Sequence, residues 1–520
     1  MKPKSLVRNI LTVGGWTLVS RGTGFARDVM MAAYLGTGPV AEAFLVAFSL
    51  PNMFRRFFAE GAFNMAFVPM FAKKLEGGED AKGFARDAWN GMVTVLLAFT
   101  VIGTIAMPWL VWAMASGFVG ERFDLAVEFG RISFSYILFI SLVALLSGIL
   151  TTHGHFSEAS FVPVLMNLVF IAAMWLAVWA GWDMGQTLSW TVPVTGVAQL
   201  AFTWVSARNV GYSFTWGVPR WTPDLRRLAL IAGPAVLSGG VVQINMLVGR
   251  QVASYTDGAV AWLSYADRLY QLPLGVVGIA IGTVLLPDLS RRLRSGDAAG
   301  GKASLNRGAE FALAMTLPAA VALVAIAVPL CSVLYERGAF TTKDTQATAL
   351  VLAAYGLGLP AFVLHKVLQP LFYAREDSRS PFLYAIASMI SNAVLAIGMM
   401  PLIGFSAAAW ATTLSGWVMV AQLWWGSRKM GDVAHFDARF KQRLPRIVLA
   451  SVLMGLVLWG AAWAMEPWLH LHLWRYLALL ALCGLGIVTY FGSGAALGAF
   501  RLSDFAALRR GRAAPNVSLD

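Results

Sequence analysis

Several arginines occupy positions inside long apolar segments, where a charged side chain is costly and therefore informative. Arg21 and Arg27 lie in the first segment, Arg55 and Arg56 lie in the second, and Arg268 lies early in the eighth. An ionised side chain at the centre of a bilayer costs at least about 2.5–3.5 kcal/mol. These side chains must therefore face water or a partner, which indicates a polar cavity within the membrane.

The acids near these arginines are too few to neutralise them. Asp28 adjoins Arg27, and Glu60 follows Arg56 by one helical turn, so pairing at these two sites is an open alternative to ligand binding. A net positive cavity favours an anion. The planar guanidinium suits phosphate, because it donates two parallel hydrogen bonds, and several arginines could enclose a diphosphate. Two further acids, expected near the outer membrane surface, are Glu42 and Asp267.

The elements that must position these side chains are membrane-spanning helices. Of the 520 residues, 58% are hydrophobic and 13% are charged, whereas soluble domains carry about 25% charged residues. Apolar stretches of about 20 residues recur from end to end, each long enough to cross a bilayer. This pattern predicts an all-α polytopic membrane protein. The fourteen predicted spans are 9–35, 41–72, 88–115, 128–152, 161–182, 188–207, 228–253, 260–289, 308–334, 346–373, 382–402, 405–427, 446–465 and 474–499.

The net charge of +13 reflects membrane topology rather than nucleic-acid binding. By our count, 28 of the 40 Lys and Arg residues lie in alternate loops and in the two terminal segments. Such loops face the cytoplasm, so both termini are expected there. Cys331 and Cys483 both lie in apolar runs, which argues against a disulfide framework or a cysteine-rich metal site.

An internal repeat divides the chain into two halves that run in the same direction. Pro51 and Pro273, each after a Leu, are 222 residues apart, and Pro163 and Pro381 are 218 apart. Six spans separate corresponding elements, which is the parallel-repeat arrangement of many transporters. The alternative is chance similarity among apolar segments rich in Gly and Pro.

At the charged positions the sequence resembles a known family. Residues 20–28 read SRGTGFARD and resemble the first-helix signature of the MurJ (MviN) lipid II flippases. Residues 43–63 resemble their second helix, and residues 265–287, which begin YADRL, also look like theirs. The resemblance covers essentially the whole chain, and its first two motifs are highly specific.

The resemblance implies a fold shared with MATE exporters and polysaccharide flippases: two six-helix lobes in a V, here residues 1–222 and 223–440. Residues 441–500 would add two helices that form a groove for an undecaprenyl tail, and residues 501–520 a cytoplasmic tail. The implied substrate is lipid II, an undecaprenyl diphosphate that carries a sugar–peptide headgroup. The central arginines of the family map onto Arg21, Arg27, Arg55 and Arg268.

Two departures from the family pattern concern the finer roles. Glu42 stands where the family usually has Asp, so the charge is kept but the reach is longer. Some members bind sodium through an Asn and an Asp one turn apart, whereas here Asn392 is followed four residues later by Ala396. Ordinary interhelical hydrogen bonding is the alternative for the remaining cation candidates, which are Asn245, Asn392, Thr412 and Thr413.

These observations predict transport by alternating access without covalent chemistry. No cofactor is expected, although the membrane potential or a cation could drive the return step. The expected partners are lipid II, membrane lipids and the cell-wall synthesis machinery, with the chain as a monomer. The alternatives are a MATE-like cation-coupled drug exporter, a polysaccharide-unit flippase, a scaffold, and a membrane enzyme built on His153, His155 and Glu158.

Overall fold

The chain is almost entirely helical, as its apolar composition predicts. The computed structural model describes residues 3–55, 62–215, 217–281, 286–471 and 473–499; the side chains of 3–11, 62–65, 233–246, 279–280, 286–287 and 293 lie outside that description. A backbone in lipid must satisfy its N–H and C=O groups internally, which a helix does. These ranges contain no β-strand, and the predicted all-α fold is confirmed.

The α-helices are α1 (Pro3–Leu35), α2 (Pro39–Arg55), α3 (Ala62–Glu76), α4 (Ala81–Ile105), α5 (Met107–Met114), α6 (Glu121–Ser133), α7 (Tyr136–Thr152), α8 (Phe156–Ala180), α9 (Met184–Asn209), α10 (Pro223–Ala253), α11 (Ala259–Ala280), α12 (Leu286–Arg294), α13 (Ala298–Ala325), α14 (Ala327–Tyr335), α15 (Thr342–Tyr373), α16 (Arg379–Ile403), α17 (Ala407–Ser427), α18 (Ala438–Ala464), α19 (Glu466–Leu469) and α20 (Trp474–Ala496). Short 3₁₀ helices are η3 (Gly404–Ser406), η4 (Arg428–Met430) and η5 (Asp432–Ala434).

Some predicted spans contain a break that hydropathy did not reveal. The span predicted at 88–115 divides at Ala106 into α4 and α5, and Pro108 lies in the first turn of α5. A proline fits there because its missing N–H would have no helical partner, whereas it would disrupt a continuous helix. Similar breaks separate α6 from α7 and α13 from α14.

Eight stretches of the described chain are long and apolar enough to cross a membrane. The total of fourteen spans remains a prediction. The eight stretches are Ala81–Ile105, Glu121–Thr152, Phe156–Ala180, Ala298–Ala325, Thr342–Tyr373, Arg379–Met430, Asp432–Ala464 and Trp474–Ala496. Exposed tryptophans gather near helix ends, as is typical of membrane interfaces. Examples are Trp109, Trp112, Trp179, Trp182, Trp463 and Trp474.

Residue contacts group the chain into two compact units. Unit 1 comprises Met1–Ser264 and Arg337–Asp344, and unit 2 comprises Tyr265–Glu336 and Thr345–Asp520. The boundary therefore falls within α11 and α15. The predicted domain limits after residues 222, 440 and 500 follow the repeat and the family, and they remain predictions.

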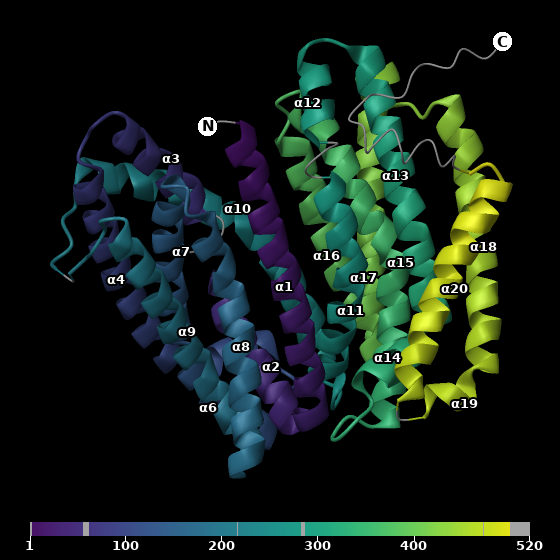
Figure 1. Cartoon of the computed structure of the whole chain (residues 1–520), viewed down its shortest axis with the longest axis horizontal. Coiled ribbons are helices and arrows are strands. Elements are labelled where there is room, and N and C mark those ends of the chain that lie inside the picture. The colour runs from purple at the N-terminus through teal and green to yellow at the C-terminus, as the bar shows by residue number, and fades with distance from the viewer. Residues whose placement is uncertain (1–2, 56–61, 216, 282–285, 472, 500–520) are drawn as a thin grey trace. The chain divides into compact units, whose positions relative to one another are not determined.

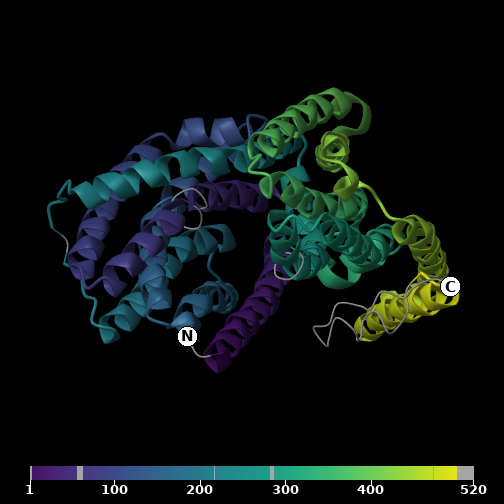
Figure 2. The same cartoon turned by 90° about the horizontal axis from the view of Figure 1, so that it is seen from above.

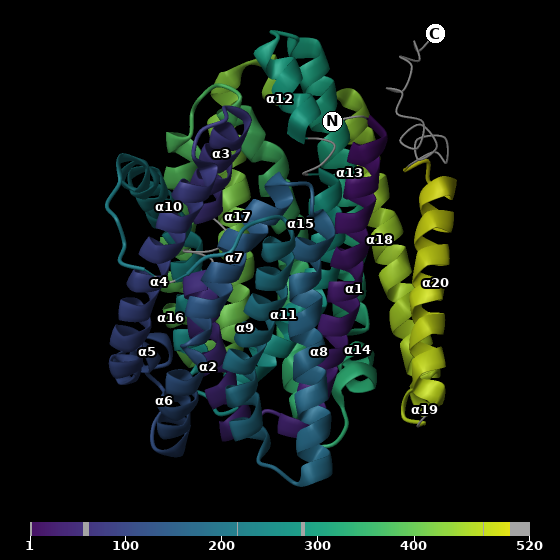
Figure 3. The same ribbon diagram turned by 60° about the vertical axis from the view of Figure 1, so that its left-hand side comes forward.

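Within unit 1, α1 packs along α8, α2 packs against α6, and α7 packs against α9 (Figure 1). Within unit 2, α16 and α17 form a hairpin, and α13 packs against α18. The helices α18 and α20 lie side by side, and α19 joins them at one end (Figure 3); Figure 2 shows the same pair from above. The hydroxyl of Tyr490 in α20 donates to the carbonyl of Ala314 in α13 at 2.6 Å, so α20 is also fixed to the body of unit 2.

Candidate functional site

Arg27 lies in the interior of unit 1, where it joins α1 to α8. The residue is 5% exposed, and its Nη2 and Nε lie 2.7 Å and 3.1 Å from Oδ1 of Asp28. Its Nη1 donates to Oδ1 of Asn167 at 3.0 Å, and the guanidinium lies 5.6 Å from the ring centroid of Phe170. The Arg27–Asp28 pair, which the sequence left open, is therefore present.

Asn167 was not identified from the sequence, although an amide in an otherwise apolar span is a signal worth following. Its Nδ2 donates to the carbonyl of Ser20 at 3.0 Å and to Oγ1 of Thr23 at 3.2 Å. A Cβ at Gly24 would lie 3.2 Å from the same amide, so the small residue permits this close approach. Asn167 thus holds α1 along the two turns that carry Arg21 and Arg27.

The other predicted arginines lie in less enclosed positions. Arg21 and Arg55 are half-buried in α1 and at the end of α2, and Arg268 is exposed on the part of α11 that belongs to unit 2. Within the part of the chain that the structure describes, Arg21 has no carboxylate at ion-pairing distance. Asp267, the neighbour of Arg268, accepts a hydrogen bond from the side chain of Gln271. Convergence of these arginines on one ligand remains a prediction.

Three other candidates lie outside the described residues. These are Arg56, Glu60 and the side chain of Asn245.

Glu42 is 1% exposed and anchors what we term the Glu42 cluster of unit 1. Its Oε2 accepts from Nη1 of Arg122 at 3.1 Å, and its Oε1 accepts from the backbone N–H of Val260 at 3.0 Å. Val260 lies in the first turn of α11, where free N–H groups and the helix dipole favour a negative charge. Arg122 also contacts Asp257 at 2.9 Å, but that carboxylate is 90% exposed, so the pair is worth little.

Asp344, 6% exposed, is the centre of a second group of contacts, which we term the Asp344 cluster. Its Oδ1 accepts from Oγ1 of Thr37 at 2.5 Å and from Nε1 of Trp262 at 2.9 Å. Its Oδ2 accepts from the backbone N–H and the hydroxyl of Thr341, at 2.8 Å and 2.7 Å. The Thr341 contacts form a capping box for α15, so one carboxylate both begins this helix and bonds to the α1–α2 turn.

Beside these clusters, the backbone at Ala33 and Gly36 passes close to the backbone at Gly338 and Ala339. The N–H of Ala339 donates to the carbonyl of Ala33 at 2.8 Å. Gly36 and Gly338 have φ values of 62° and 58°, and a Cβ on either would lie 2.5 Å or less from a facing carbonyl oxygen. Only glycine fits both requirements. Together, these contacts tie the ends of α1 and α2 to the first turns of α11 and α15.

Two of the cation candidates, Thr412 and Thr413, donate to backbone carbonyls of helices. Thr412 donates to the carbonyl of Ala408 at 2.9 Å, and Thr413 donates to the carbonyl of Ala354 at 2.7 Å. Asn392 is buried in α16. Within the described ranges, no group of three or more His, Cys, Asp or Glu side chains is placed to hold a metal ion.

The histidines considered for an enzyme have local contacts. His153 contacts the carbonyl of Ile149 through Nδ1 at 2.9 Å and packs between Phe71 and Tyr212. His155 contacts Glu158 at 2.9 Å. Each ring therefore has a partner that explains its position.

Fold and site together define a multi-span, all-helical membrane transporter with ionisable groups inside its helices. The structure is similar to an inward-facing MATE family transporter of the MOP superfamily, with a TM-score of 0.65. The two chains are 13% identical over 79% of this chain and 94% of the other, so the similarity shows a shared fold only. The chain belongs to the lipid II flippase MurJ family, whose model matches residues 31–479.

Relatives agree over nearly the full length. A probable lipid II flippase MurJ of Rhizobium tropici is 43% identical over 98% of both chains. The lipid II flippase MurJ of Burkholderia cenocepacia is 36% identical over 88% of this chain and 90% of its own. A solved structure of lipid II flippase MurJ in an inward closed conformation gives a TM-score of 0.77 at 25% identity, over 96% of this chain and 99% of the other.

Proposed function

We propose that this chain flips lipid II from the cytoplasmic to the periplasmic leaflet of the inner membrane. One observation carries the proposal: the chain is 43% identical, over 98% of its length, to a probable lipid II flippase. The half-buried Arg21 of α1 and Arg55 of α2 agree with it, because a substrate with a diphosphate needs a positively charged path through the bilayer. The activity is transport, and no covalent step is required.

The proposed path begins at the arginines. Arg21 is the strongest candidate of the first helix for binding the diphosphate, because Asp28 already neutralises Arg27. Arg55 and Arg268 complete the proposed site, and the headgroup would move through water while the tail stays in lipid. The exposed apolar side chains along α18 and α20 suit a polyprenyl tail. They include Leu456, Trp459, Leu477, Leu480, Ile487 and Val488.

Alternating access also requires contacts that close one end of the path and that can break to open it. The Glu42 and Asp344 clusters join α1 and α2 to the first turns of α11 and α15, and we propose that they hold one end of the path closed. Their contacts are hydrogen bonds and an ion pair rather than a large apolar surface. Such contacts can exchange for water when the path opens, at a net cost of about 1.5–3 kcal/mol for each hydrogen bond to a carboxylate.

The energy source and the surroundings are also proposals. Both termini would lie in the cytoplasm, where the basic loops place them, and the chain would work as a monomer alongside the cell-wall synthesis machinery. No cofactor is required. The membrane potential or a cation would return the empty, positively charged site, because moving one charge across 100 mV is worth about 2.3 kcal/mol. Flipping that persists after the potential and the ion gradients are collapsed would contradict this step.

The decisive test is lipid II flipping in cells depleted of their own flippase. The wild-type chain should restore growth and expose lipid II at the periplasmic face, whereas Arg21→Ala, Arg55→Ala and Arg268→Ala should not. The matched control is Arg208→Ala, which removes an exposed arginine at the end of α9. Normal flipping by all three variants at normal protein levels would refute the site. Failure of the wild type, together with export of a polysaccharide unit or an organic cation, would refute the substrate.

A further inference from the structure

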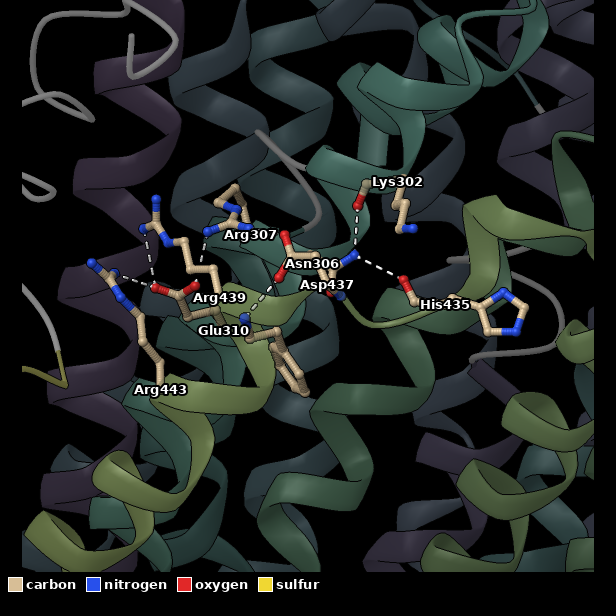
Figure 4. Close-up of polar contacts among 9 residues, drawn as sticks. Lys302, Asn306, Arg307, Glu310, His435, Asp437, Arg439 and Arg443 are labelled. Atoms are coloured by element: carbon tan, nitrogen blue, oxygen red, sulfur yellow. Dashed lines mark hydrogen bonds and ion pairs between the residues drawn. The ribbon is translucent and has the colours of Figure 1, made fainter. Parts of the chain in front are cut away.

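Charged side chains outside the proposed transport path gather at two places, and at the first of them they fix a helix. In unit 2, Glu310 of α13 accepts from three guanidiniums, those of Arg307, Arg439 and Arg443 (Figure 4). Arg307 also pairs with Asp437, the N-cap residue of α18. These ion pairs join α13 to the start of α18, so we assign this network a structural role.

The second place is a groove between α5 and α6 of unit 1. The two helices pack against each other (Figure 3), and the groove has a volume of about 450 Å³, within the range of small-molecule sites. Its apolar lining residues are Pro108, Phe123, Val127 and Ile132, and its charged ones are Asp124, Glu128 and Arg131. The groove therefore combines an apolar wall with charges of both signs.

The charged side chains of the groove lie on one exposed face of α6. Asp124, Glu128 and Arg131 are spaced by four and three residues, and all three are exposed. Glu128 accepts from Nε2 of Gln186 at 2.5 Å. Among the residues that the structure describes, the side chains of Asp124 and Arg131 have no hydrogen-bonding or ion-pairing partner. A carboxylate and a guanidinium in the same groove thus remain open to a ligand.

The groove lies where the chain enters the membrane. The 21 residues from 132 to 152 carry no charge, and they belong to a stretch that is long and apolar enough to cross a bilayer. At about 1.5 Å per residue they span roughly 30 Å, the thickness of the hydrocarbon core. Arg131 directly precedes this run, and the exposed Trp109 and Trp112 of α5 follow Pro108, as in an interfacial aromatic belt. The charges therefore lie at the level of the lipid headgroups.

The order of the charges along α6 matches that of a zwitterionic headgroup. From the membrane outward, the groove presents Ile132, then Arg131, then Glu128 and Asp124. Phosphatidylethanolamine presents, in the same direction, its acyl chains, a phosphate and a terminal ammonium. Along the helix axis, Glu128 is about 4.5 Å and Asp124 about 10.5 Å from Arg131. One lipid can therefore place its phosphate at the arginine and its ammonium at the carboxylates.

Other phospholipids fit this groove less well. Two carboxylates and one guanidinium give the lining a net charge of −1, which disfavours a headgroup that carries only negative charge. A primary ammonium has three N–H donors for the carboxylates, whereas the trimethylammonium of phosphatidylcholine has none. Hydrogen bonds between ionised groups are the strong ones, so this difference should be measurable.

We propose that the groove between α5 and α6 binds the headgroup of phosphatidylethanolamine, with Arg131 at the phosphate and Asp124 and Glu128 at the ammonium. The ligand is a lipid of the surrounding membrane, and its binding does not depend on flipping. None of the three residues belongs to the proposed transport path. In the predicted orientation, the groove opens at the outer surface of the membrane.

The test is native mass spectrometry of the full chain in detergent, titrated with phosphatidylethanolamine, phosphatidylcholine and phosphatidylglycerol of the same acyl chains. The wild type should bind phosphatidylethanolamine most tightly. Arg131→Gln should weaken this binding about fivefold, because a basic residue near lipid phosphates is worth roughly that factor. Asp124→Asn and Glu128→Gln should each weaken it about twofold to fivefold, as expected for an exposed ion pair, without weakening the binding of phosphatidylglycerol.

The matched control is Glu121→Gln, which removes another exposed carboxylate from the first turn of α6. Glu121 does not line the groove, so this variant should bind phosphatidylethanolamine like the wild type. The control also tests the helix dipole as an alternative, because that dipole favours both first-turn acids alike. If Glu121→Gln weakens binding as much as Asp124→Asn does, general charge at the helix end explains the effect and the proposal is wrong.

Two further results would overturn the site. The first is equal binding of phosphatidylethanolamine and phosphatidylcholine by the wild type, which would show that the carboxylates do not bind the ammonium. The second is wild-type affinity in Arg131→Gln or in the double variant Asp124→Asn/Glu128→Gln. Melting temperatures of all variants, measured in the same detergent, separate loss of binding from loss of fold, and the exposed positions should melt close to the wild type.

Discussion

The buried Arg27–Asp28 pair allows folding to be separated from substrate binding. Arg27→Ala would leave the Asp28 carboxylate, 8% exposed, without the two hydrogen bonds at 2.7 Å and 3.1 Å. Removing one partner of a buried ion pair destabilises a protein by about 3–5 kcal/mol, because the other charge stays buried. The lost hydrogen bond to Asn167 adds about 1.5–3 kcal/mol at most, since it involves a charged donor.

The matched variant removes both charges. Replacing a buried pair by apolar side chains is often nearly neutral, so Arg27→Ala/Asp28→Ala should recover most of the stability that Arg27→Ala loses. Asp28→Ala alone should destabilise the protein less than Arg27→Ala, because Arg27 then keeps its hydrogen bond to Asn167. The measurement is unfolding of the purified protein in detergent, by heat or by graded addition of a denaturing detergent, with all four proteins compared in a double-mutant cycle.

A single variant as stable as the wild type would show that the pair contributes nothing to the fold. A double variant no more stable than the single ones would show that the lost contacts, and not the remaining charge, set the cost. Either outcome would refute the reasoning. If the double variant is stable, its flipping activity then measures what Arg27 contributes to transport beyond folding.

Three further predictions concern the helix ends and the first helix. Glu42→Ala should destabilise the protein by about 3–5 kcal/mol, because it leaves the largely buried Arg122 without this carboxylate. Glu42→Gln should destabilise it less, because the amide oxygen still accepts from the first turn of α11. Equal melting temperatures for the two variants would contradict this reasoning. Gly36→Ala should lower the stability by at least about 1–2 kcal/mol, because its φ is positive, and it should slow flipping. The control is Gly38→Ala, which should leave the melting temperature unchanged because no atom lies within 4 Å of the added carbon. Arg21→Ala should abolish flipping with an unchanged melting temperature, and a large loss of stability would instead assign Arg21 a structural role.

The sequence by itself determined the class of protein and the location of its charges. Hydropathy and the placement of Lys and Arg depend only on which residues follow one another, so the spans, the predicted orientation and the arginines at 21, 27, 55 and 268 can be read from the chain directly. The motif of residues 20–28 was specific enough to indicate the family, which the match over residues 31–479 confirmed.

Only the tertiary structure decided which charges have partners. Arg27 meets Asn167 at a separation of 140 residues, Glu42 meets Val260 at 218, and Thr37 meets Asp344 at 307. A helix that is apolar on most sides carries little periodicity, so its sequence does not say which face meets which neighbour. Rotation and packing of the helices set those contacts, and they make Glu42 the partner of Arg122 rather than an isolated acid.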